Sequence, residues 1–285
     1  MPTVIALVST KGGVGKTTIA ANIAGILAAY GMRVCVIDAD IQPSLSKYYP
    51  IEERAPRGLT AVVTQGGSVS EDCISRTAIP NLSVVCSDAT PDGLLQSWLK
   101  DREDRLMILR RAVRSPAMQA FNAIIIDTQG ATGELQRTAA MAADVMVSPI
   151  KPDVLSANEF STGTMAMLDE LNRLADFGEA FRSGDLYALI NAQERNNNAR
   201  GVTEYIRRSF AGHRKVKVLN TIIPSAAAYT SAATAQIPVH EYDRRSRGQN
   251  SAWQTMHHLA WELFPELAEI YVDDIEGDDA KEVAV

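Results

Sequence analysis

A glycine-rich stretch near the start of the chain carries the side chains best suited to bind phosphate. Residues 9–18 read STKGGVGKTT, between an apolar run and an alanine-rich one. Glycines let successive backbone N–H groups turn toward a phosphate, and a helix starting there adds partial positive charge. In such a loop the lysine of a GKT triplet reaches the β- and γ-phosphates of a nucleotide, and the hydroxyl of the threonine that follows binds Mg²⁺. The stretch predicts a nucleotide site made of Lys11, Gly12, Gly13, Val14, Gly15, Lys16, Thr17 and Thr18.

The loop departs from the general G-x-x-x-x-G-K-[ST] pattern at one position. Thr10 stands where the first glycine is expected, and a second lysine, Lys11, follows it. Two lysines in a loop of this length indicate a nucleotide site far more strongly than a glycine-rich turn alone would.

Carboxylates follow two later apolar runs. Asp38 and Asp40 are two residues apart, so on an extended strand their side chains point the same way. Asp127 closes the run AIIID, and Gly130 follows it after Thr128 and a glutamine. Ligands bind beyond the carboxyl ends of the strands in open α/β sheets. We therefore expect these groups near the glycine-rich loop, with Asp127 at Mg²⁺, although Asp38 would equally suit a cap on the following turn.

The elements around these residues alternate between short apolar runs and longer helical stretches. This alternation predicts an α/β fold with a doubly wound, mostly parallel sheet flanked by helices. The expected strands are 3–8, 33–37, 82–86, 123–126, 145–150, 186–190 and 216–223, and the expected helices are 16–30, 101–114, 134–142, 156–174, 200–210 and 249–264. Residues 51–70 are richer in Pro, Gly and Thr and are expected to hold a loop and a short helix.

Composition supports a globular protein and excludes several classes. The chain has 285 residues, of which 46% are hydrophobic and 22% charged, with a formal net charge of −6. No linker rich in Ser, Gly or Pro divides it, so we expect one domain over residues 1–272 and an acidic tail over 273–285. The three cysteines form no CxxC pair and none follows Cys86, which argues against a disulfide framework and an iron–sulfur carrier.

Positive charge is concentrated late in the chain. Residues 195–247 hold ten Lys or Arg and three acids, whereas residues 266–285 hold eight acids and one Lys. Charge runs of this kind usually solvate a helix face, but a basic cluster also suits nucleic-acid phosphates. The candidates for DNA contact are Arg207, Arg208, Arg214, Lys215, Lys217, Arg244, Arg245 and Arg247.

Together, KGGVGKT at 11–17, DADIQ at 38–42 and IIIDTQG at 124–130 resemble the motifs of the ParA/MinD family of deviant Walker A ATPases. The resemblance extends over nearly the whole chain. Within the family, the sequence is similar to Soj-type members, including those of integrative and conjugative elements. The resemblance implies that Lys11 crosses an ATP-dependent homodimer interface to the phosphates bound by the other subunit. It further implies catalytic roles for Lys11, Lys16 and Asp40, with Asp40 orienting the attacking water and Asp38 organising the Mg²⁺ shell.

Other positions matched to the family have less specific signals. Gly130 would offer its N–H to the γ-phosphate as a switch, although many relatives have Pro where Gln129 stands. Asn191 would contact adenine, or would simply form a turn, and Pro224 would pack on the base.

The resemblance implies a cargo-positioning ATPase that binds DNA without sequence preference in its ATP state and is stimulated by a ParB-like partner. Such a protein would be cytoplasmic and nucleoid-associated. One departure weighs against DNA binding, because residues 225–229, directly after the IIP segment, contain no arginine. A conjugation-accessory ATPase that recruits transfer machinery or another protein cargo therefore remains open. Membrane binding is not expected, because the acidic end offers no basic amphipathic helix.

Overall fold

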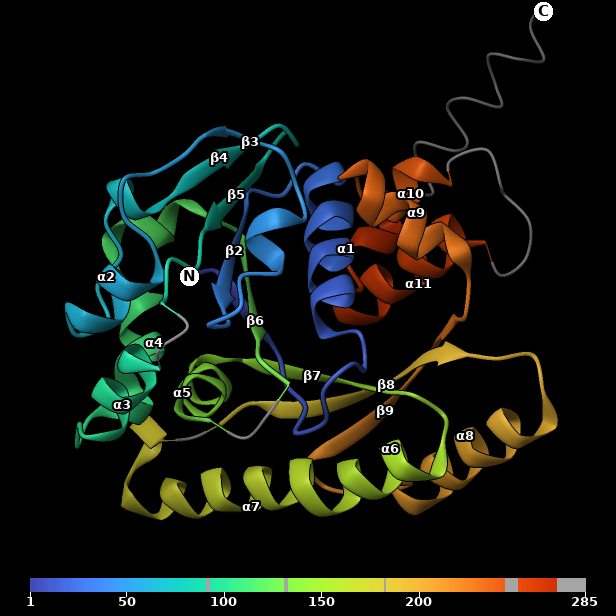
Figure 1. Ribbon diagram of the computed structural model, residues 1–285. Coiled ribbons are helices and arrows are strands. Elements are labelled where there is room, and N and C mark those ends of the chain that lie inside the picture. The colour runs from blue at the N-terminus through green and yellow to red at the C-terminus, as the bar shows by residue number, and fades with distance from the viewer. Residues whose placement is uncertain (91–92, 131–132, 182, 244–250, 271–285) are drawn as a thin grey trace, which may run out of the picture.

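The computed structural model describes residues 1–90, 93–130, 133–181, 183–243 and 251–270. Its centre is a nine-stranded sheet in the order β3-β4-β5-β2-β6-β1-β7-β8-β9 (Figure 1). The strands are β1 (Thr3–Leu7), β2 (Val34–Ala39), β3 (Ile51–Glu53), β4 (Ser75–Thr77), β5 (Leu82–Val85), β6 (Ala123–Thr128), β7 (Val145–Ile150), β8 (Asp185–Gln193) and β9 (Val216–Pro224). From β5 to β9 every neighbouring pair is parallel, whereas β3–β4 and β4–β5 are antiparallel.

Helices cover both faces of this sheet. One face carries α1 (Lys16–Ala29), α9 (Ala227–Ala235), α10 (Val239–Tyr242) and α11 (Ala252–Leu263) (Figure 1). The other carries α2 (Leu59–Thr64), α3 (Leu94–Lys100), α4 (Ile108–Ala112), α5 (Glu134–Ala142), α6 (Val154–Glu159), α7 (Met165–Leu174) and α8 (Asn197–Ser209). Because both faces are covered, β2 and β6 are buried along their whole length, which explains the apolar runs that precede Asp38 and Asp127.

The seven expected strands and the doubly wound fold are confirmed. Sequence patterning missed β3 and β4, since three residues are too few to show an alternating pattern. It also missed α9, a stretch of Ala, Ser and Thr with little amphipathic contrast.

Two expected helices differ from the structure. The helix expected at 101–114 is wrong at its start, because the chain turns at Arg102 and Asp104, which form an ion pair, and α4 begins only at Ile108. The helix expected at 156–174 is interrupted by a π-helical turn over Phe160–Thr164 that separates α6 from α7. Turns of this kind often mark functional positions, and this one contacts the glycine-rich loop.

Candidate functional site: a phosphate loop with buried carboxylates

The glycine-rich loop joins β1 to α1 and forms a hollow of about 330 Å³. Gly13 and Gly15 adopt positive φ angles of 70° and 93°, a backbone conformation that residues with a Cβ rarely take. The lining comes from the ends of three adjacent strands, β1, β2 and β6. The residues that line it are Gly12, Gly13, Gly15, Lys16, Thr17, Thr18, Asp40, Thr128 and Gly130.

Lys16 supplies the buried cation of this hollow. Lys16 is only 6% exposed. Burial lowers the pKa of its ammonium, whereas the nearby Asp127 and, to a smaller extent, Asp40 raise it. A desolvated ammonium aimed into a hollow edged by backbone N–H groups suits the phosphates of a nucleotide.

Asp38 and Asp127 are direct neighbours across the β2–β6 pair and are both fully buried. Burial is the largest cause that raises the pKa of Asp38 to about 6 and that of Asp127 to about 7. Lys16 and the Thr17 hydroxyl lower the pKa of Asp127, but not enough to offset its burial. In the described part of the chain, Asp38 Oδ1 and both Asp127 oxygens are buried without a hydrogen-bond partner.

These oxygens fit a magnesium ion. Buried carboxylates without partners are costly, and a hard divalent cation removes that cost by binding oxygen. The described residues contain no cluster of three His, Cys, Asp or Glu, so the site offers an ion two carboxylates and the Thr17 hydroxyl. Such a sparse set matches Mg²⁺, which retains waters and binds substrate phosphates.

Asp38 and Asp40 lie in different environments although they are only two residues apart. Asp38 Oδ2 accepts hydrogen bonds from the Ser46 backbone N–H at 2.8 Å and the Ser46 hydroxyl at 2.6 Å. Asp38 thus also holds the turn that follows β2, as the capping alternative anticipated. Asp40 is half-buried, accepts from the Gln42 N–H at 2.9 Å, and lines the hollow, where a water could reach it.

Lys11 points away from this hollow within one chain. Its ammonium donates to the Ser156 hydroxyl at 2.8 Å and lies 3.5 Å from Asp153 Oδ1. Asp153 caps α6 by accepting from the Ser156 N–H at 2.7 Å. Lys11 is therefore held at the first turn of α6, with about a third of its side chain exposed.

Asn191 and Pro224 lie outside the lining of the hollow. The Asn191 side-chain amide donates to the Val14 carbonyl at 2.7 Å, so it supports the loop from below. It fills the space beside Gly15 so closely that a Cβ there would collide with it. Pro224 ends β9, where it pairs with Gln193. A contact of either residue with a base remains a prediction.

Several supports of the loop carry no signal in the sequence. Thr10, the residue that breaks the general pattern, has its hydroxyl 3.2 Å from that of Thr164. A Cβ on Gly163 would lie 2.5 Å from the Thr10 hydroxyl, so the π-helical turn provides room for this threonine. Gln136, fully buried on α5, donates to the Ser9 carbonyl at 2.8 Å. These contacts link residues more than 100 positions apart, so local patterns could not have revealed them.

The expected DNA-binding residues that the structure describes do not form one free basic surface. Among those described, Arg207 donates to the Leu219 and Asn220 carbonyls of β9, at 3.3 and 3.0 Å. Three others also have partners within the chain: Arg208 pairs with Glu204, Lys215 pairs with Asp185, and Lys217 lies over the Tyr187 ring. Arg214 is exposed, and Arg244, Arg245 and Arg247 lie outside the described residues.

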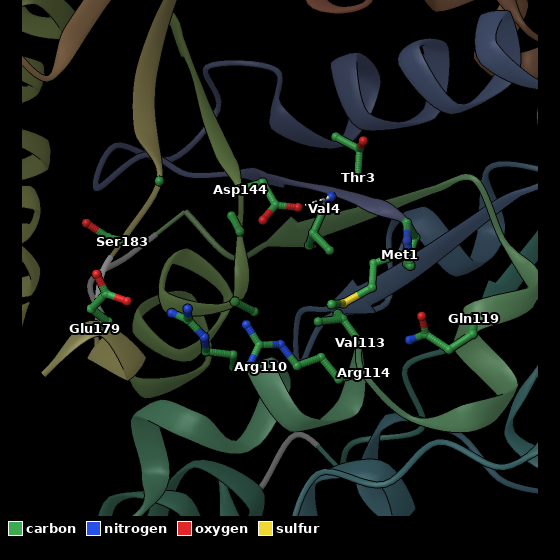
Figure 2. A pocket seen from close by; sticks show the side chains of 14 residues that line it. Met1, Thr3, Val4, Arg110, Val113, Arg114, Gln119, Asp144, Glu179 and Ser183 are labelled. Atoms are coloured by element: carbon green, nitrogen blue, oxygen red, sulfur yellow. Dashed lines mark hydrogen bonds between the residues drawn. The ribbon is translucent and has the colours of Figure 1, made fainter.

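A larger hollow, of about 540 Å³, lies at the opposite end of the sheet and is not part of this site (Figure 2). It is lined by the start of β1, by Arg110 on α4 and Arg114 just after it, and by Asp144 and Glu179. Figure 2 shows the Asp144 carboxylate turned toward Val4, whose N–H donates to it at 2.9 Å, with Arg110 and Arg114 on the other side of the hollow. Positive and negative side chains both line that hollow, and none of its lining residues belongs to the glycine-rich loop.

Comparisons with known proteins agree with this geometry. A family model described as an AAA domain matches residues 2–176. The chain is 28% identical to the sporulation initiation inhibitor protein Soj of Bacillus subtilis, over 87% of this chain and 94% of that protein. It is 26% identical to the chromosome partitioning protein ParA of Caulobacter vibrioides, over 87% and 90%.

Solved structures share the fold. An ATP complex of a variant of Cyanothece McdA aligns with a TM-score of 0.74 at 20% identity, covering 90% of this chain and 96% of that one. In the described part of this chain, no helix is long and apolar enough to cross a bilayer. The family match and the motif geometry together place the chain in the AAA-domain family, among the ParA/MinD group of deviant Walker A ATPases.

Proposed function

We propose that this protein is an ATPase whose nucleotide state controls dimerisation and the binding of DNA or cargo. The observation that carries the proposal is the convergence of Lys16, Asp40 and Gly130 at one hollow, with the buried Asp127 near enough to Lys16 to act on its pKa. ATP and Mg²⁺ are the cofactors, with Thr17, Asp38 and Asp127 as the magnesium ligands. The McdA structure with ATP is a further, fold-level support.

Each residue has a definite task in hydrolysis. Lys16 and the loop N–H groups bind the β- and γ-phosphates and stabilise the charge that develops during transfer. Asp40 holds the water that attacks the γ-phosphorus, while the bond to the β–γ bridging oxygen breaks to leave ADP and phosphate. The metal ion, when bound, neutralises phosphate charge. Hydrolysis is slow, because the bound nucleotide is itself the signal.

Lys11 connects hydrolysis with association. In the ATP-bound homodimer it leaves Asp153 and Ser156 and reaches the phosphates of the partner subunit, as an arginine finger does. The pair that holds it is half-exposed, so releasing it costs at most about 1 kcal/mol. ATP then becomes part of the interface.

The cargo is DNA of a plasmid, chromosome or integrative element, bound nonspecifically in the ATP state and released when a ParB-like partner stimulates hydrolysis. The name of the Caulobacter relative supports a role in partitioning. The protein acts in the cytoplasm at the nucleoid, as one ATPase domain over 1–272 with an acidic tail over 273–285. Dimerisation doubles each basic surface and thereby raises DNA affinity.

A conjugation-accessory ATPase with a protein cargo is the second candidate. It is favoured by the absence of arginine from residues 225–229 and by the internal pairing of Arg207 and Lys215. Both candidates use the same ATPase site.

Two measurements test these proposals. Phosphate release from ATP with Mg²⁺ tests the ATPase, and its absence, with or without DNA, would refute it. Binding to a random-sequence duplex at moderate salt, with ATP, ADP or neither, tests the cargo. Binding that occurs with ATP but not with ADP or without nucleotide supports a role in DNA partition. An active ATPase that binds no DNA in any of the three states favours a protein cargo.

A further inference from the structure

Gly130 is the residue after β6 that lies against the phosphate loop. A Cβ on Gly130 would lie 2.6 Å from the Gly12 Cα and 3.4 Å from the Lys16 Nζ. The Gly130 carbonyl in turn lies 3.5 Å from a Cβ placed on Gly12. The two backbones are therefore in contact, and a shift of Gly130 changes the edge of the hollow beside the Lys16 ammonium.

The residue before it is anchored through its side chain. Gln96, on α3, donates from Nε2 to the Gln129 Oε1 at 2.8 Å. The other end of the Gln129 amide fills the space beside Gly133, where a Cβ would collide with it. Gly133 is also the N-cap residue of α5. Gln129 is thus held between two helices, and neither contact involves the phosphate loop.

α3 is fixed on its inner side and open on its outer side. Leu95 and Leu99 are buried in the core, whereas Leu94 is 66% exposed. Gln96 is half-buried between these two environments. The hydrogen bond from Gln96 is therefore a direct connection from a surface helix to the segment that touches Gly12.

We propose that Gln96 and Gln129 form a positioning pair that holds Gly130 in place against the phosphate loop and connects α3 to the occupancy of the γ-phosphate position. The proposal rests on the proposed ATPase. It assigns to Gln129 a task that a proline ring would perform through backbone stiffness, since proline fixes φ without a partner. Neither glutamine lines the hollow, so both act through Gly130.

A double-mutant cycle of Gln96→Ala and Gln129→Ala tests the pair. Each single variant is expected to lower kcat about three- to tenfold with KM for ATP and Kd for ADP within about twofold, because ground-state binding depends on the loop. If the residues act through one another, the double variant loses no more than either single one. Ser97→Ala, exposed on the same helix, is the matched control. An unchanged kcat, or losses that multiply in the double variant, would overturn the proposal.

Hydrogen exchange supplies a readout that does not need turnover. In the nucleotide-free protein, Gln96→Ala and Gln129→Ala should each increase exchange in peptides that contain Gly130. A nonhydrolysable ATP analogue should slow exchange in α3 of the wild type, and Gln96→Ala should remove that response. A response of α3 that persists in the variant would contradict the connection. Wild-type protein that releases no phosphate would refute the ATPase instead, while the nucleotide-free exchange still decides the fate of the pair.

Discussion

The chain concentrates charged side chains in two places, and it uses them in opposite ways. At the carboxyl ends of β1, β2 and β6 the ionisable side chains are few but buried: Lys16, Asp38 and Asp127 are nearly inaccessible. Within the described part of the chain, three of the carboxylate oxygens there have no hydrogen-bond partner. Along α8 and β9 the charges are many and mostly half-buried or exposed, yet several are paired within the chain. In the first region, a ligand that binds the unpartnered oxygens removes a desolvation cost, so the charges favour ligand binding. In the second region, the charges form their interactions within the protein.

Edge strand β9 shows what the second arrangement achieves. Arg207 donates to two of its carbonyls, and Glu262 of α11 accepts from the Asn220 and Thr221 N–H groups at 2.6 and 2.9 Å. Side chains therefore cover backbone groups that an edge strand would otherwise expose to another chain. Basic composition alone did not distinguish this structural task from DNA binding.

Removal of the buried cation is expected to have the largest effect. Lys16→Ala should lower ATP affinity and turnover at least about 100-fold, because among the described residues no other side chain that lines the hollow is a cation. Isothermal titration with ATP and Mg²⁺ and a phosphate-release assay measure both quantities. Lys100→Ala, exposed on α3, is the control, and near-normal turnover of Lys16→Ala would refute the site.

Removal of the half-buried Asp40 carboxylate should separate binding from chemistry. Asp40→Ala is expected to keep ATP binding and ATP-dependent dimerisation but to lose turnover by about 100-fold, since Asp40 orients water rather than phosphate. Single-turnover hydrolysis beside analytical ultracentrifugation reports both. Normal hydrolysis by this variant would remove Asp40 from the mechanism.

Lys11→Ala tests whether the second lysine acts between subunits. The variant should bind nucleotide as a monomer, and light scattering should show no ATP-dependent dimer. Its free energy of unfolding should fall by at most about 1 kcal/mol, because the pair with Asp153 is half-exposed. A dimer that forms equally well would contradict the role in trans.

These expectations show what sequence could and could not reveal. That the loop, Asp38, Asp40 and Asp127 meet at one edge of the sheet was predictable, because the β–α alternation brings the carboxyl ends of β1, β2 and β6 together. Their roles at a nucleotide stay predictions from residue types and spacings. The contacts of Lys11 with Ser156, of Asn191 with Val14 and of Thr10 with Thr164 were not predictable, because they join segments over 140 residues apart.

The buried carboxylates should also make stability depend on pH in a distinctive direction. Burial raises the pKa of Asp127 to about 7 in the native state, whereas in the unfolded chain its carboxyl group has an ordinary pKa near 4. The native state therefore binds one more proton than the unfolded chain between these two pH values. Stability therefore falls as pH rises from about 4 to about 7. His257 acts oppositely over this range, because burial lowers its pKa to about 4 and its native form resists protonation.

A variant isolates the contribution of Asp127 from that of His257. Relative to wild type, nucleotide-free Asp127→Asn should gain stability between pH 4.5 and pH 7.5 by on the order of 2 kcal/mol. Urea unfolding at both values measures the difference. A stability difference independent of pH would show that Asp127 is ionised throughout, with Lys16 as its sufficient partner.

The smallest effects distinguish the charges along α8 from one another. Arg207→Ala should cost about 1 kcal/mol of unfolding free energy, since two β9 carbonyls lose their donor. Arg208→Ala removes an exposed pair with Glu204 and should cost about 0.5 kcal/mol or less. If the ATP state binds DNA, Arg208→Ala and Arg214→Ala should each reduce the salt dependence of binding by about one phosphate contact, while Arg207→Ala should not. Should Arg207→Ala instead weaken DNA binding at unchanged stability, the contrast between the two regions would fail, and this arginine would belong to a DNA surface rather than to the edge of the sheet.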